Sequence, residues 1–389
     1  MDPGLTDEQR LIRKELRSMC SEFGDEYWRQ KDRDHEFPTE FHDTFAENGW
    51  YGLTVPQEYG GQGYGLEEGV IVQQEVARSG AAHAGVGLTG TQIFNAAPLI
   101  SFGTEDQKER YLPDIARGES RLAVAITEPN AGLDTSRLET VAERTGDKYM
   151  VDGQKVWVGN AQTADLLLLM ARTSPRDESD RFDGLSLFLT PFDATDGTVD
   201  VSEMEKAGRR AIDSNEVWFE DFSIPVADRI GEEGEGFTYL LEFANSERIT
   251  VAAAAVGIGQ AAIEAASQYA SERVVFDNPI GSYQGIQHPL ADSWSKLQQA
   301  EVMTRYAATL YDEGMDCGGE ANAVKLRASE TCVEACERAV RALGGMGYAE
   351  EYDVPRYWRE SILTVISPVS NELVLNYIGT KELGMPKSY

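Results

Sequence analysis

The pattern of apolar and polar residues changes twice along this 389-residue chain. From Leu5 to about Arg121, apolar residues recur every three or four positions, as in LIRKELRSMCSEF, which predicts amphipathic helices. From Leu122 to about Ile230, they gather in short runs such as LLLLMART, separated by Gly, Asp and Pro, which predicts strands. Long alanine-rich helical patterns then return. We therefore predict an α+β fold, not a doubly wound sheet, with an N-terminal helical domain (1–121), a middle β-domain (122–230) and a C-terminal helical domain (231–389).

Two of the predicted strands end in polar turns. The first, AITEPNAGLD, runs from Ala125 to Asp134 and passes from an apolar strand through Thr127 and Glu128 into a turn of Pro, Asn and Gly. The second, QKVWVGNA, ends in the same way and carries Trp157. Two strand ends and an indole ring suit a planar cofactor such as a flavin. Ordinary hairpin ends have the same spacing, so the spacing alone leaves both interpretations open.

Charge restricts the partners. The chain has 66 acidic and 35 basic residues, with 25 Arg and 10 Lys among the basic ones, and a formal net charge of −31. Such a balance repels nucleic acid and anionic membrane surfaces, so we expect neither as a partner. The acids are spread along the chain, which leads us to expect a halophilic, cytoplasmic enzyme; an acidic protein of an ordinary mesophile is the alternative.

Other signals are weak. The first residues lack the apolar segment of a signal peptide, and the most apolar window, ITVAAAAVGIGQAAIEAA, is rich in alanine and interrupted, so we expect no membrane span. Cys20, Cys317, Cys332 and Cys336 do not have the pattern of a disulfide framework, and we expect them to be core thiols. The four histidines form no pair at zinc-ligand spacing, so we predict no metal.

Two glycine-rich segments need separate interpretations. GVGLTG, from Gly85 to Gly90, matches the GxGxxG pattern of dinucleotide-binding turns, but a helical pattern precedes it where that turn requires a strand. We therefore interpret these glycines as sites of close helix packing. GGMGY, from Gly344 to Tyr348, ends a long helical pattern and is expected to let the backbone approach a pyrophosphate.

Six segments in this order resemble the acyl-CoA dehydrogenase family: VPQEYGGQGYG, TEPNAGLD, KVWVGN, FEDFSIPVADRIGEEGEGF, RVVFDNPIGSYQGIQ and RALGGMGY. The resemblance covers nearly the whole chain. It implies a C-terminal four-helix bundle and one FAD bound between the β-domain and the C-terminal helices. It also implies a homotetramer or homodimer in which neighbouring subunits complete each site.

The resemblance assigns FAD contacts residue by residue. Thr127 matches a residue that hydrogen-bonds the isoalloxazine ring, and Trp157 matches one that packs beside it. Arg273 matches the family's arginine facing the pyrophosphate, and Arg341 replaces a family glutamine; surface salt bridges are the alternative for both arginines. The complete implied FAD set is Val124, Ile126, Thr127, Leu133, Trp157, Val158, Gly159, Arg273, Phe276, Gln284, Arg341, Gly344, Gly345, Ser370 and Glu372.

The family's reaction removes an α-proton with a carboxylate and transfers a β-hydride to the flavin, giving a 2-enoyl-CoA, and electron-transfer flavoprotein is the usual oxidant. In most members the base lies in a segment that matches Arg359 to Leu373, where this chain has Pro368. The isovaleryl and long-chain type carries its base on a neighbouring helix, at the position of Glu247. The resemblance thus implies Glu247 as the base; a solvated glutamate paired with an arginine is the alternative.

The implied substrate contacts are Leu133, Asn245, Arg248, Ser367 and Pro368.

Several residues depart from the family pattern. Pro368 lacks the N–H that helps to hold the thioester oxygen, so Val369 or Ser367 would have to donate instead. Leu133 replaces a serine, and Gly159 replaces a Thr or Ser near the hydride-accepting nitrogen. The small Ser367 favours a branched or bulky acyl group. We expect an acyl-CoA dehydrogenase; the alternative is a flavin-binding homologue that is non-oxidative or inactive because of Pro368.

Overall fold

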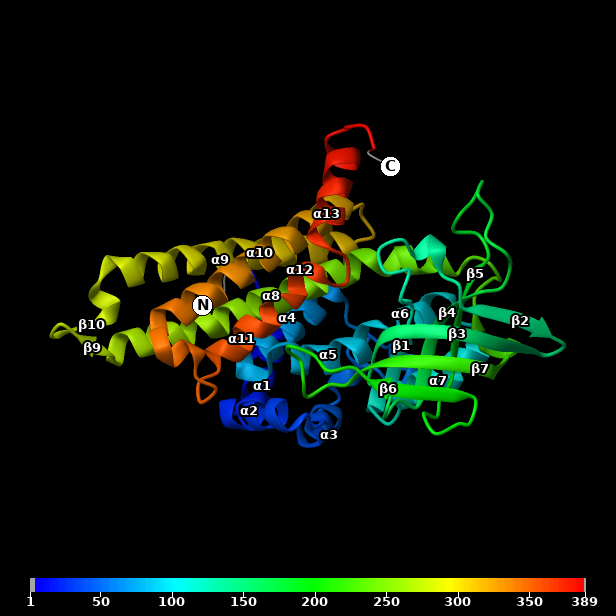
Figure 1. The fold of residues 1–389 in the computed structure, drawn as a ribbon, viewed down its shortest axis with the longest axis horizontal. Helices are drawn as coiled ribbons and strands as arrows, with labels where there is room; N and C mark the ends of the chain where they lie inside the picture. The colour runs from blue at the N-terminus through cyan, green and yellow to red at the C-terminus, as the bar shows by residue number, and fades with distance from the viewer. Residues whose placement is uncertain (1–3, 388–389) are drawn as a thin grey trace.

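The computed structural model of this protein describes residues 4–387 and arranges them as helices, then strands, then helices (Figure 1). The predicted α+β fold class is confirmed. The β-domain lies at one end of an elongated helical body, and the first helices pack along one side of the C-terminal helices (Figure 1).

The N-terminal domain is helical, as the spacing of its apolar residues predicts. Thr6 and Thr104 each form a capping box with a glutamine three residues later, which fixes where α1 and α7 begin. The GVGLTG segment lies inside α5, so its interpretation as part of a packed helix is confirmed. The helices are α1 (Asp7–Cys20), α2 (Asp25–Asp34), α3 (Thr39–Glu47), α4 (Leu66–Val76), α5 (Ala82–Phe94), α6 (Ala97–Phe102) and α7 (Glu105–Arg117).

The middle domain is an eight-stranded sheet in the order β6-β7-β3-β2-β4-β5-β8, with β1 paired in parallel to β4. β4 is buried along its whole length, as its continuous apolar run predicts. The strands are β1 (Leu122–Ala125), β2 (Val141–Thr145), β3 (Lys148–Gly159), β4 (Leu166–Arg172), β5 (Leu185–Pro191), β6 (Val199–Glu203), β7 (Ser214–Pro225) and β8 (Arg229–Ile230).

The C-terminal domain is built around one long helix, α8. By length and composition α8 could span a membrane, but 83% of its most apolar window is buried within the protein, as in the core helix of a globular fold. A small hairpin, β9 (Val274–Val275) with β10 (Asn278–Pro279), follows α8 and was missed by the expectation of helices alone. The helices are α8 (Gly236–Glu272), α9 (Gln284–Asp312), α10 (Gly318–Leu343), α11 (Val354–Ser361), α12 (Leu363–Ile366) and α13 (Asn371–Tyr377).

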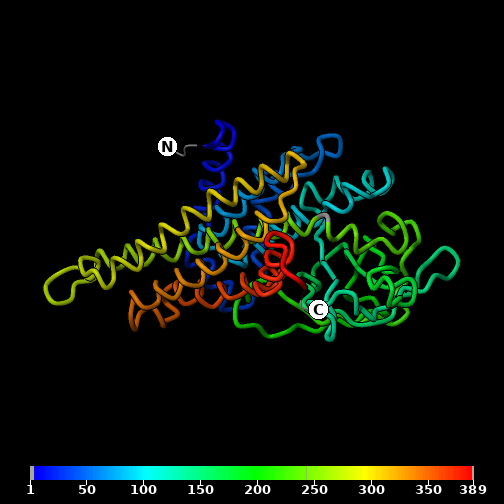
Figure 2. The backbone as a smooth tube through the Cα atoms, turned by 90° about the horizontal axis from the view of Figure 1, so that it is seen from above, coloured from blue at the N-terminus to red at the C-terminus, as the bar shows by residue number. Residues whose placement is uncertain are grey.

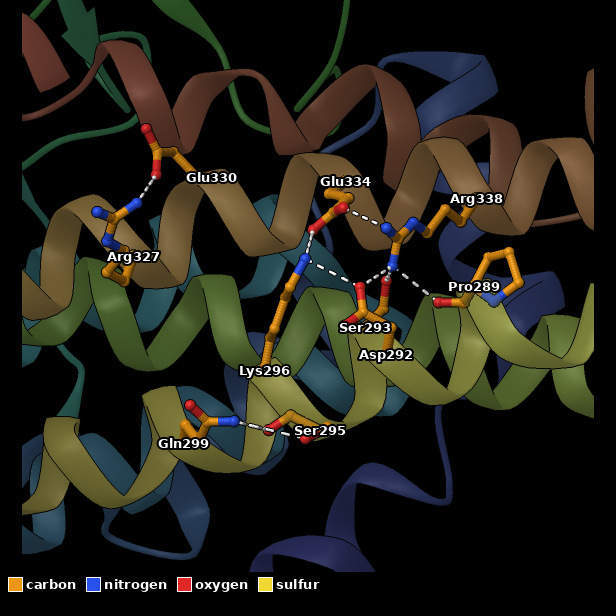
Figure 3. Close-up of polar contacts among 10 residues, drawn as sticks. All are labelled: Pro289, Asp292, Ser293, Ser295, Lys296, Gln299, Arg327, Glu330, Glu334 and Arg338. Atoms are coloured by element: carbon orange, nitrogen blue, oxygen red, sulfur yellow. Dashed lines mark hydrogen bonds and ion pairs between the residues drawn. The ribbon is translucent and has the colours of Figure 1, made fainter.

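Ion pairs join α9 to α10 on their outer faces (Figure 3). Lys296 Nζ lies 2.9 Å from a carboxylate oxygen of Asp292 and 2.8 Å from one of Glu334. Arg338 lies 2.7 Å from Asp292 on the opposite helix. All four cysteines are buried and free, so their interpretation as core thiols is confirmed.

Candidate active site

The ends of β1 and β3 lie side by side. The Val156 N–H donates to the Thr127 carbonyl at 2.9 Å, and Lys155 Nζ donates to the Ile126 carbonyl at 2.9 Å. These two bonds join the polar segment that follows β1 to the end of β3. They bring together the two polar strand ends that the sequence analysis singled out. The structure therefore places Thr127 close to Trp157.

A buried ion pair supports this edge. Lys155 Nζ lies 2.7 Å from Glu128 Oε1, and the Glu128 carboxylate also accepts the N–H groups of Glu139 at 2.6 Å and Thr140 at 2.9 Å. Burial by itself would raise the pKa of Glu128, but Lys155 and the N–H donors hold that pKa below its usual range. Burial lowers the pKa of Lys155 to about 8, against the opposing effect of Glu128. Both groups are therefore charged near pH 7.

This edge presents features that fit a flavin. The Trp157 side chain is 59% exposed on a backbone with φ of 63°, which points a large ring outward from the strand end. Asn160, three residues after Trp157, has both side-chain polar atoms buried without a partner among the described residues. Such atoms need hydrogen-bond partners, and the heteroatoms of a bound isoalloxazine would provide them.

Four other predicted flavin contacts have different surroundings. The Val158 side chain is fully buried in the β-domain core, so only its backbone can reach a cofactor. Val124 and Ile126 are partly buried against a cluster of apolar residues that joins α6 and α7 to the sheet. Leu133, predicted for both cofactor and substrate, is 61% exposed and does not line the cavity described next.

Glu247, Ser367 and Pro368 line a cavity of about 190 Å³. Glu247 projects from α8, Pro368 follows α12, and the opposite wall is the α5 segment that includes Gly87 and Gly90. Burial raises the pKa of Glu247, an effect that Arg248 partly offsets. The structure thus brings together Pro368, at the position to which the resemblance assigns the usual base, and the alternative carboxylate of Glu247.

The loop around Pro368 is held by a buried lysine that the sequence analysis missed. Lys325 Nζ donates to the Val369 carbonyl and to Asn371 Oδ1, both at 2.7 Å. The Ser367 N–H donates to the Leu363 carbonyl at 2.9 Å, so it is not available to a substrate. Of the two donors considered to replace the missing N–H, Val369 therefore remains.

Other predicted substrate contacts lie outside this cavity. Arg248 Nη1 donates to Asn245 Oδ1 at 3.3 Å, and neither residue lines the cavity. Burial lowers the pKa of Arg248, while Glu247 and Tyr377 raise it. No ion pair joins Glu247 to Arg248 in the part of the chain that the structure describes, so the alternative of a salt-bridged surface glutamate does not describe Glu247.

Sequence analysis also missed three residues around the cavity. His83 and Arg209 line it, and Glu360 accepts the N–H groups of both, at 2.7 and 3.2 Å. Burial and the charge of Arg209 lower the pKa of His83 to about 3, so His83 is neutral. No motif marks these residues, because only the folded chain brings α5, the loop before β7 and α11 together.

A second group of predicted FAD contacts lies at the far end of the helical body. Arg273, Phe276, Gly344 and Gly345 line an open pocket of about 700 Å³ around the β9–β10 hairpin. An added Cβ at either glycine would meet nothing within 4 Å, as close approach of a ligand to the backbone requires. Arg341 is exposed and lies 2.6 Å from Glu337, the surface pairing that the sequence analysis kept as its alternative.

The two sets of predicted FAD contacts are far apart in one chain. The 37 residues of α8 span about 55 Å, and the hairpin and the β-domain lie at opposite ends of the molecule (Figures 1 and 2). Gln284, the first residue of α9, belongs to the hairpin end. Ser370 caps α13 by accepting the Leu373 N–H, and Glu372 lies in the first turn of that helix. One FAD could touch both ends only if a second copy supplied one of them.

Comparison with known proteins identifies the family of all three domains. The chain matches the acyl-CoA dehydrogenase N-terminal domain over residues 6–119, the middle domain over 123–222 and the C-terminal domain over 234–381. It is 35% identical over 386 residues to "Acyl-CoA dehydrogenase fadE12" of Mycobacterium bovis, covering 99% of this chain and 98% of that one. It is 33% identical over 356 residues to "Caffeyl-CoA reductase-Etf complex subunit CarC" of Acetobacterium woodii, covering 91% and 93%.

Solved structures agree. The glutaryl-coenzyme A dehydrogenase–glutaryl-CoA complex superposes with a TM-score of 0.93 at 29% identity, covering 100% of this chain and 98% of that one. The FAD complex of PigA superposes with a TM-score of 0.91 at 25% identity, covering 99% of each chain. Acyl-CoA dehydrogenases are FAD-dependent oxidoreductases, and the exposed indole and unpartnered polar atoms at the strand ends fit that cofactor.

Proposed function

This chain belongs to the acyl-CoA dehydrogenase family, and on that premise we propose that it oxidises an acyl-CoA thioester to the 2-enoyl-CoA with Glu247 as the base. The observation that carries the proposal is the shared cavity of Glu247 and Pro368. Pro368 cannot accept a proton, and Glu247 is the only carboxylate among the described residues that line this cavity.

Glu247 has the properties that a base needs here. Its burial raises its pKa, which makes the carboxylate a stronger base toward the weakly acidic α-proton of a thioester. The strand ends that carry Thr127 and Trp157 would hold FAD, which would supply the acceptor for the hydride from the β-carbon. Removal of a proton by Glu247 and of a hydride from the neighbouring carbon leaves the two electrons of the former C–H bond as the C=C bond of the product.

The thioester oxygen requires donors while negative charge develops on it. The Ser367 N–H is bound to Leu363, and Pro368 has none, so we assign one donor to the Val369 N–H. Lys325 holds the Val369 carbonyl and thereby orients the same peptide segment. Val369 is thus a binding group, and Lys325 is a positioning residue.

The partners follow from the same proposal. We propose electron-transfer flavoprotein as the oxidant, supported by the Etf complex named for the CarC relative. The separation of the two predicted FAD contact sets supports a homotetramer or homodimer that completes each site between subunits. The net charge of −31 supports a halophilic, cytoplasmic setting, and unfolding in high KCl with refolding in low salt would contradict it.

Anaerobic bleaching of the bound flavin by acyl-CoAs tests the reaction directly. We expect short, branched or long acyl-CoAs to bleach the wild-type flavin and Glu247→Gln to slow bleaching by 10²-fold or more, on the order expected for loss of a general base. Glu264→Gln is the matched control, because Glu264 lies on the same helix with an exposed side chain paired to Arg78. Equal bleaching in Glu247→Gln would refute the assignment of the base, and no bleaching by any acyl-CoA would refute the dehydrogenase.

A further inference from the structure

Arg209 lines the cavity of Glu247 without a direct ion pair. Its Nε is buried without a hydrogen-bond partner, and none of the side chains that the structure describes forms an ion pair with its guanidinium. Asp213 and Glu360 act on it only at longer range. Isolated buried charges are unfavourable, so they are normally paired with an opposite charge or with a ligand.

Arg209 is held in an unfavourable backbone conformation. Its φ of 55° lies in the left-handed region, which non-glycine residues seldom adopt. The loop is fixed on three sides: the Arg209 N–H donates to Glu360, Arg359 Nη1 donates to the Ala207 carbonyl at 2.6 Å, and the Arg210 N–H donates to Asp32. The surrounding residues therefore determine where this side chain enters the cavity.

Two glycines make room for the guanidinium. An added Cβ at Gly87 would lie 2.4 Å from Arg209 Nε, so a larger residue at that position of α5 would force the guanidinium to shift. An added Cβ at Gly159 would lie 3.2 Å from Arg209 Nη2. Gly159 is also where the family has a Thr or Ser beside the flavin. Arg209 thus lies between the flavin edge and the α5 wall of the cavity.

The cavity matches a small charged acyl group. A cavity of about 150 Å³ holds a benzene ring, so 190 Å³ accommodates an acyl chain of about six non-hydrogen atoms. Its other walls include Val86, Phe94 and Val251, which suit the methylene groups of such a chain. His83, neutral at pH 7, adds no charge. Glu247 and Arg209 are the only charged side chains among the described residues that line it.

We propose that Arg209 is a specificity-determining residue that binds a carboxylate on the acyl group, so that the substrate is an acyl-CoA with a second, free carboxylate. This deepens the dehydrogenase proposal and depends on it. An arginine forms two parallel hydrogen bonds with a carboxylate, which supplies the missing counter-ion. An acyl chain that ends in a methyl group would leave the guanidinium unpaired.

The test compares acyl-CoAs that differ only at the end of the chain. Binding is measured as the perturbation of the flavin spectrum in Glu247→Gln, where turnover does not interfere, with glutaryl-CoA against pentanoyl-CoA and adipyl-CoA against hexanoyl-CoA. We expect at least one carboxylate-bearing member to bind about 10- to 100-fold more tightly than its methyl counterpart, as hydrogen bonds to charged groups provide. Equal or weaker binding of both carboxylates overturns the proposal without any variant of Arg209.

Variants of Arg209 locate the effect. Arg209→Gln in the Glu247→Gln background should remove the preference for the carboxylate, and Arg209→Lys should restore part of it. Arg327→Gln is the control for loss of one positive charge, because Arg327 is exposed on α10. FAD content and melting temperature show whether each variant folds; if Arg209→Gln does not fold, the Arg209→Lys variant and the wild-type preference still decide.

Two further outcomes separate this proposal from the reaction itself. If Arg209→Gln weakens binding of every acyl-CoA equally, Arg209 acts on the thioester or the flavin and the substrate assignment is wrong. If the wild-type flavin is bleached by methyl-terminated acyl-CoAs alone, the dehydrogenase proposal stands and the carboxylate proposal fails. Tight binding of a carboxylate-bearing acyl-CoA with no bleaching supports the role of Arg209 and refutes the dehydrogenase.

Discussion

Replacing Lys155 with Met should destabilise the β-domain and loosen the flavin edge. Lys155 is fully buried and Glu128 is 6% exposed, so the variant leaves a buried carboxylate without its cation. Removal of one partner of a buried ion pair costs about 3–5 kcal/mol. Glu128 keeps its bonds to the N–H groups of Glu139 and Thr140, which places the expected loss near the lower limit, about 3 kcal/mol.

The assay is urea unfolding of the FAD-bound protein, followed by tryptophan fluorescence, with flavin content measured in parallel. Lys148→Met is the matched control, because Lys148 is an exposed lysine at the start of the same strand, and it should change the free energy of unfolding by less than about 0.5 kcal/mol. The double variant Glu128→Gln with Lys155→Met should recover about 1 kcal/mol or more, because it removes the unpaired charge.

Two results would refute this reasoning. If Lys155→Met unfolds at the same urea concentration as Lys148→Met, the ion pair does not stabilise the domain. If Lys155→Met loses stability but keeps its FAD as tightly as the wild type, the bond from Lys155 to the Ile126 carbonyl does not position the flavin edge.

Two other predictions concern turnover. The rate of anaerobic flavin bleaching should rise with pH through the pKa of Glu247, which burial places above its ordinary value, because only the ionised carboxylate accepts the α-proton; a rate that stays level down to pH 4.5 in stopped-flow measurements contradicts this. Lys325→Met should lower the bleaching rate about 10-fold or more while FAD remains bound, because it frees the Val369 carbonyl and Asn371; an unchanged rate would show that Lys325 does not position the loop.

The sequence by itself determined the order of the three domains. Two local signals specify helices and strands without knowledge of the fold. Apolar residues recur every three to four positions in the helices, and they form continuous runs in buried strands such as β4. The ordered motifs likewise identified the family, and the spacing of strand and turn marked Thr127 and Trp157. The two-residue strands of the β9–β10 hairpin were missed because so short a pairing leaves no periodicity.

Tertiary structure alone decided which residues share a site. Glu247, Arg209 and Pro368 come from three separate segments, and their cavity forms only where α5, α8 and the loop before β7 pack together. The same packing binds the Ser367 N–H to Leu363, so this N–H cannot donate to the thioester oxygen. Arg248 and Leu133 lie outside the cavity. The predicted FAD contacts form two groups separated by the length of α8. Distances between residues far apart in the chain depend on how the core packs, and no local pattern encodes them.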